Sequence, residues 1–126
     1  MDLAELIRLA RALYLAAGSE PEETMAALAW LARNWICAGG LSIDDCCTRM
    51  CALAGRAPSA GPMPRAASAD TAFCRALAVT GFVWAGDYAD PTEGATLVHR
   101  HDEAPAWAEH AKGTVLIGPW MFYRPR

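Results

Sequence analysis

The chain has 126 residues, a net charge of −3, and 54% hydrophobic against 20% charged residues. Such a chain has enough apolar surface to fold around a core and is not intrinsically disordered. Its length predicts a single domain over residues 1–126. The weakly acidic balance excludes a broad basic surface, so we expect no nucleic-acid partner.

The sequence carries no pattern typical of a membrane or export segment. No apolar run approaches the roughly 18 residues that a membrane span needs. Asp2 and Glu5 stand where a signal peptide is basic, and Arg8 and Arg11 interrupt the apolar stretch that would follow. We therefore expect no membrane insertion and a cytoplasmic location by default.

Helical periodicity dominates the first two thirds of the chain. Apolar residues recur at helical spacing over residues 2–17, which predicts a helix capped by Asp2. A second helix is predicted over residues 19–38, because Ser19 and Glu22 have the spacing of a capping box. The remaining predicted elements are a helix over 42–55, an irregular loop over 55–67, a helix from residue 68 or 70 to 84, a turn over 87–94, a strand over 95–101, a short helix over 102–112 and a strand over 114–123.

These elements predict an α+β fold, mainly helical, with a small antiparallel sheet near the C-terminus. The helical stripes and the strands need a common partner for burial, so we expect one core. Its predicted members are Met25, Leu28, Leu31 or Ala32, Phe73, Leu77, Leu97, Val115 and Ile117.

Neither the cysteines nor the histidines form a clear metal-binding pattern. Of the five cysteines, only Cys47 and Cys51 are a candidate ligand pair, and we interpret all five as small buried side chains in a reducing compartment. His99 and His101 alternate along a predicted strand, but no acidic or cysteine partner stands at a fixed offset, so we expect both to face solvent. No metal or other cofactor is predicted.

Two further clusters have both a structural and a functional interpretation. Glu20, Glu22 and Glu23 stand at the start of the second predicted helix, where carboxylates complement the helix dipole. Six aromatic residues crowd the C-terminal third, where they serve as core or line a groove in which sugar rings stack. They are Trp84, Tyr88, Trp107, Trp120, Phe122 and Tyr123.

Four motifs in order resemble the spore-cortex-lytic (SleB/CwlJ-type) cell wall hydrolases. The first spans residues 9–34 and ends at Asn34, the only asparagine of the chain. Its matching positions are Ala10, Arg11, Tyr14, Ala17, Glu20, Pro21, Glu23, Ala27 and Asn34. The second, residues 90–95, is similar to the family's D-P-T-G-G-A, the third, residues 105–107, to its P-x-W, and the fourth, residues 117–123, to its I-G-x-H-x-F-Y.

This resemblance implies a lysozyme-like domain that cleaves the glycan strands of peptidoglycan, mostly as a lytic transglycosylase. In that chemistry a single glutamic acid protonates the glycosidic oxygen, and the 6-hydroxyl of the sugar closes an anhydro ring. Neither a second carboxylate nor a cofactor is needed. The resemblance also implies that Tyr14, Asn34, Trp107 and Tyr123 line one concave surface that binds the glycan, with Glu20 close by.

The chain departs from the family at the position of the catalytic glutamate, which is Ala16. Leu15 and Gly18 replace its glycine and arginine neighbours, and Trp120 replaces a histidine of the last motif. Glu20 remains as the candidate catalytic acid, four residues further along.

Three functions therefore stay open. One is peptidoglycan cleavage by an enzyme that uses Glu20 or another acid and reaches the cell wall through an assembly or by lysis. The second is a catalytically silent relative that acts as a glycan-binding or structural module of a phage-like or secretion assembly, with protein partners there. The third is an unrelated function on a borrowed fold.

Overall fold

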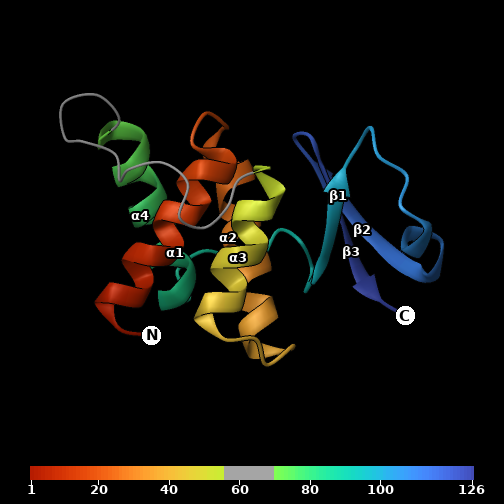
Figure 1. Cartoon of the computed structure of the whole chain (residues 1–126), viewed down its shortest axis with the longest axis horizontal. Helices are drawn as coiled ribbons and strands as arrows, with labels where there is room; N and C mark the ends of the chain where they lie inside the picture. Colours follow the sequence, from red (N-terminus) through yellow and green to blue (C-terminus); the bar gives the residue numbers. More distant parts are fainter. Residues whose placement is uncertain (56–69) are drawn as a thin grey trace.

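The computed structural model describes residues 1–55 and 70–126. Four helices pack against one another and a small sheet stands beside them, as expected for a compact α+β fold (Figure 1). The elements are α1 (Leu3–Ala17), α2 (Glu22–Cys37), α3 (Ile43–Leu53), α4 (Asp70–Ala85), β1 (Leu97–Arg100), the 3₁₀ helix η1 (Ala106–His110), β2 (Ala111–Ile117) and β3 (Trp120–Pro125).

The predicted cap of α1 is confirmed, and Ser42, the first residue of the third predicted helix, caps α3. At α1, the Glu5 backbone N–H donates to Asp2 Oδ1 over 2.8 Å and the Asp2 backbone N–H to Glu5 Oε1 over 3.1 Å. At α3, the Asp45 backbone N–H donates to Ser42 Oγ over 3.1 Å.

The predicted cap of α2 is wrong, because Ser19 does not begin that helix. The Glu20 backbone N–H still bonds to the carbonyl oxygen of Ala17, over 3.0 Å, so residues 18–20 complete the turn that ends α1. Pro21 then takes the N-cap position in an extended conformation, with φ −59° and ψ 157° and no side-chain cap. Helix α2 therefore starts at Glu22, the residue directly after this proline.

The sheet contains one strand more than predicted. The predicted strand over 114–123 is a hairpin, in which β2 and β3 meet at Gly118 and Pro119 with Ile117 opposite Trp120. Gly118 has φ +56°, a conformation that glycine adopts readily, and it reverses the chain there. All pairs are antiparallel, and the order β1-β3-β2 leaves β1 at an edge.

The helix predicted over 102–112 is also wrong, since only the five residues of η1 are helical. Pro105 lies inside the predicted span, and a proline both lacks an N–H donor and disfavours helix in the residue before it. The segment 102–105 is therefore non-helical and η1 begins after Pro105.

Helix α2 lies at the centre of the core. Thr24 to Ala29 are buried without interruption, so α2 packs on almost all sides. Met25, Leu28, Leu31, Ala32 and Ile117 are buried as predicted. Phe73, Leu77, Leu97 and Val115 are only half-buried, because α4 contributes Ala76, Val79 and Val83 to the core and the sheet contributes Ile117, Trp120 and Phe122.

The prediction for the cysteines holds for three of the five. Cys46, Cys47 and Cys51 are buried on α3, and burial raises the pKa of the Cys46 thiol to about 11. Cys37 and Cys74 are exposed, since they lie on helix faces that turn away from the core. The predicted loop falls, apart from Gly55, outside the described residues, and no helix in the described ranges is both long and apolar enough to cross a membrane.

Candidate functional site

Asn34 holds the segment that leads into the sheet. Its Nδ2 donates to Asp90 Oδ2 over 3.1 Å and to the carbonyl oxygen of Ala95 over 3.0 Å. The next residue, Trp35, donates from Nε1 to the carbonyl oxygen of Thr96 over 2.7 Å. We call this set, Asn34, Trp35, Asp90, Ala95 and Thr96, the α2 joint. Both amide hydrogens of Asn34 are used inside it, so this side chain has a structural role.

The Asp90 carboxylate, which accepts from Asn34 in the α2 joint, also accepts the hydrogen bonds that form the turn after it. Its Oδ1 accepts from the backbone N–H and the hydroxyl of Thr92, over 2.8 and 2.6 Å, and its Oδ2 from the Gly94 N–H over 2.9 Å. Burial by itself raises the pKa of Asp90, but the hydrogen bonds from Thr92, Asn34 and Gly94 outweigh burial and leave the pKa below its ordinary value. Glu93, between these donors, has φ +56°. The motif at residues 90–95 is therefore a hydrogen-bonded turn.

Three adjoining hollows form a groove along β1, the edge strand of the sheet. The first, of about 470 Å³, lies between the end of α3 and the residues after β1, and includes His99, Glu103 and Trp120 in its lining. The second, about 260 Å³, shares Leu53 and Trp107 with the first. The third, about 510 Å³, shares Trp35, Arg49 and Thr96 with the second. We call these hollows together the β1 groove.

Trp107 stands at the side of the β1 groove in a cluster of three rings. Its ring is edge-on to those of His99 and Tyr123, with centroids 5.7 and 5.3 Å away. The Tyr123 hydroxyl lies 2.9 Å from His99 Nε2, and His99 Nδ1 lies 2.5 Å from the carbonyl oxygen of Arg100. Trp107 is 37% exposed, so it presents apolar ring surface to solvent while its neighbours fix its position.

The expectation that His99 faces solvent is therefore wrong. The side chain is half-buried, because the register of β1 on β3 pairs Leu97 with Tyr123 and His99 with Met121. In that register His99 lies diagonal to Tyr123 on the same face of the sheet. The alternation of His99 and His101 along the sequence did not predict which residues of the partner strand would lie beside them. His101 is exposed, as expected.

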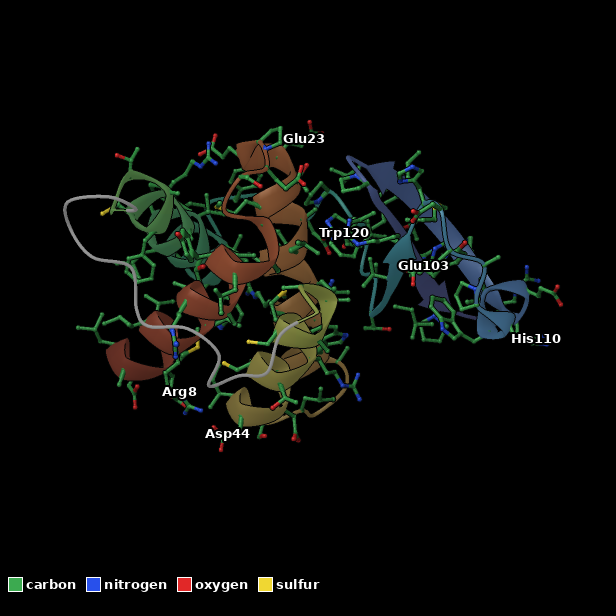
Figure 2. The ribbon with its side chains drawn as sticks, turned by 45° about the horizontal axis from the view of Figure 1, so that its top comes forward. Arg8, Glu23, Asp44, Glu103, His110 and Trp120 are labelled. Atoms are coloured by element: carbon green, nitrogen blue, oxygen red, sulfur yellow. The ribbon has the colours of Figure 1, made fainter. Side chains whose placement is uncertain are left out.

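Trp120 closes the inner side of the first hollow. Figure 2 shows it at the boundary between helices and sheet, with Glu103 on the sheet side. It is 2% exposed, and the Arg100 guanidinium lies 4.6 Å from the centre of its ring. Its buried Nε1–H has no hydrogen-bond partner within residues 1–55 and 70–126. Such a donor is costly unless a water or a ligand oxygen accepts from it.

Side chains occupy much of the exposed backbone edge of β1. The Thr96 carbonyl accepts from Trp35, the Arg100 N–H donates to Glu103 Oε1 over 2.9 Å, and the Arg100 carbonyl contacts His99. A peptide that adds to a sheet needs these backbone groups free. The edge therefore favours a ligand held by side chains.

Tyr14 lies at a separate hollow, over α1 and α4. Leu15, Ala16 and Ser19 also line this hollow of about 330 Å³, which shares no lining residue with the β1 groove. Tyr14 is held there by an edge-to-face contact with Phe73, at 6.2 Å between ring centres. The structure thus brings Trp107 and Tyr123 together but does not bring Tyr14 or Asn34 to them.

Glu20 is half-buried in the turn between α1 and α2 and does not line the hollow beside Ala16. Its backbone carbonyl accepts from Arg75 Nη2 over 2.7 Å, which ties this turn to α4. No acidic side chain in the described ranges lines that hollow.

No protein-family model, curated protein or solved structure matches this chain. In the part of the chain that the structure describes, no three His, Cys, Asp or Glu side chains gather closely enough to hold a metal ion. Aromatic, basic and acidic side chains line the β1 groove, and these are the groups it offers to a ligand.

Proposed function

We propose that this protein is a glycan-binding module without lytic activity, and that the β1 groove holds the sugar chain. The observation that carries the proposal is the exposed ring of Trp107, fixed by His99 and Tyr123. The C–H faces of sugar rings are apolar and pack on aromatic rings, while their hydroxyls bind a few placed polar groups.

A polar group with this use is present in the first hollow, where the Glu103 carboxylate can accept from a sugar hydroxyl. An open groove suits a chain that enters and leaves along its length. The resemblance to cell wall hydrolases supports peptidoglycan glycan as the first chain to test.

The site lacks the group that lysis needs. Protonation of a glycosidic oxygen requires a carboxylic acid within hydrogen-bond reach of that oxygen, in an environment that keeps the acid protonated. Ala16 has no such group, and Glu20 does not line the hollow beside it. Glu103 is exposed, and its Oε1 already accepts from the Arg100 N–H. None of the three meets the requirement.

The test is binding and lysis measured on the same protein. Calorimetry with a glycan-strand hexasaccharide should show binding by the wild type, and Trp107→Ala should weaken it about tenfold, the loss of roughly 1.4 kcal/mol of stacking. Phe82→Ala is the matched control, because Phe82 is 52% exposed on α4 and lines none of the hollows of the β1 groove. Its affinity should equal that of the wild type.

On purified peptidoglycan, neither the wild type nor Glu20→Gln should release soluble muropeptides. Robust release by the wild type that Glu20→Gln abolishes would overturn the proposal and make Glu20 the catalyst. Absence of binding to the hexasaccharide would also overturn it.

A further inference from the structure

The end of the β1 groove farthest from Glu103 is basic. Arg49 of α3 and Arg124 of β3 both line the third hollow, together with Trp35, Gly39 and Gly94. Among the residues that the structure describes, no aspartate or glutamate lines this hollow or the one beside it. On a chain of net charge −3, two arginines from distant parts of the sequence thus share one cavity.

Neither arginine forms an ion pair in the described part of the protein. The ion pair within residues 1–55 and 70–126 is Arg8 with Asp44, on α1 and α3 (Figure 2). Arg49 and Arg124 have no carboxylate within salt-bridge distance in these ranges. A guanidinium has five N–H donors in a planar fork and binds a carboxylate through two of them.

Packing restricts where these cations can lie. The Arg49 guanidinium lies 5.6 Å from the centre of the Trp35 ring, and Trp35 is fixed by its hydrogen bond to Thr96. The stem of Arg124 passes beside Gly94, where its Cδ is 3.8 Å from the position a side-chain Cβ would take. Gly39 and Gly94 also line this end of the groove.

We propose that Arg49 and Arg124 form an anion site for a carboxylate carried by the bound glycan, so that the ligand is an acidic polysaccharide. This inference rests on the proposed function. The opposite end of the groove carries Glu103 beside Arg100, a balanced pair of charges. This distribution fits a chain with spaced acidic groups better than a nucleic acid, which carries a phosphate on every unit.

The experiment compares two forms of one chain. The first is a hexasaccharide of alternating N-acetylglucosamine and N-acetylmuramic acid with free lactyl carboxylates, and the second is the same chain with these carboxylates converted to methylamides. The wild type should bind the acidic form at least fivefold more tightly, and added salt should reduce this difference. Arg49→Gln and Arg124→Gln should each remove most of this difference between the two forms.

Arg8→Gln is the matched control. It makes the same change in charge, lies outside the groove, and breaks only an exposed ion pair of little energetic value. It should keep the preference for the acidic form.

The outcomes separate the two proposals. Equal binding of both forms by the wild type would overturn the anion site and leave the glycan-binding function standing. Binding of neither form would overturn the glycan-binding function itself. Binding of single-stranded oligo(dT), lost in Arg49→Gln and Arg124→Gln, would identify a phosphate site and contradict the acidic-glycan inference.

Discussion

The α2 joint and the β1 groove lie side by side and use their polar groups in opposite ways. In the joint, Asn34, Asp90 and Trp35 direct their donors and acceptors to one another and to the backbone. In the groove, the Arg49 and Arg124 guanidiniums have no carboxylate within salt-bridge distance in the described ranges. The first pattern is that of a structural element, and the second is that of a binding surface.

The comparison gives a structural role to residues that the sequence alone offers as candidates for function. Asn34 and the turn at residues 90–95 belong to the motifs that resemble the cell wall hydrolases, and in the structure they connect α2 to the sheet. Variants in the joint should therefore cost stability, and variants in the groove should cost affinity. Each of the following predictions tests that division.

The largest effect is expected for Asp90→Ala. It removes the acceptor of four hydrogen bonds and leaves their donors partly buried, which should lower the free energy of unfolding by about 3 kcal/mol. Urea denaturation measures the change, and Asp87→Ala, at an exposed position nearby, should change it by less than about 0.5 kcal/mol. A loss below about 1 kcal/mol for Asp90→Ala would contradict the structural role of the joint.

Gly118→Ala should lower the free energy of unfolding by about 2 kcal/mol. Gly118 has φ +56°, and an added Cβ would lie 2.8 Å from Oγ1 of the buried Thr24. Gly81→Ala is the control, because Gly81 is inside α4 with no atom within 4 Å of an added Cβ, and it should stabilise the protein by about 0.5 kcal/mol. The melting temperature should fall in Gly118→Ala and rise in Gly81→Ala. A shift of both melting temperatures in the same direction would contradict the prediction.

The pKa of Asp90 predicts a loss of stability in acid. Because this pKa is lower in the folded than in the unfolded protein, the stabilisation is complete above the unfolded value, about 3.9, and disappears as pH falls through the folded value. Asp90→Asn should flatten this dependence, with a smaller total effect than Asp90→Ala. The test is the free energy of unfolding of the wild type and of Asp90→Asn, measured from pH 7 downward. Parallel curves would show that Asp90 does not cause the loss of stability in acid.

The smallest effect is expected for Ala16→Glu. Ala16 lines an open hollow, so the new carboxylate stays hydrated. The free energy of unfolding should therefore change by less than about 1 kcal/mol. We expect this variant to have no lytic activity, since Leu15 and Gly18 also differ from the pattern of the cell wall hydrolases that the sequence resembles. Release of soluble muropeptides by this variant would locate the catalytic site beside α1. It would contradict the assignment of the β1 groove as the functional site.

The sequence predicted the helices well because local signals define them. Asp2 with Glu5 and Ser42 with Asp45 are caps within four residues, and apolar spacing marked the buried faces. The hairpin at Gly118 was missed although Gly118 and Pro119 form a dipeptide that is typical of turns. The α2 joint and the ring cluster were not predictable, since they depend on contacts such as Asn34 to Asp90 and on the register of β1 against β3.

The most direct test of the account is the response of the tryptophan side chains to the glycan. The chain has five tryptophans, of which Trp35, Trp107 and Trp120 line the β1 groove and Trp30 and Trp84 do not. In a ¹⁵N NMR titration with the acidic hexasaccharide, the indole N–H signals of Trp107 and Trp120 should shift while those of Trp30 and Trp84 stay in place. Shifts that instead gather at the backbone signals of Tyr14 and Ser19, with Trp107 and Trp120 unchanged, would contradict the account.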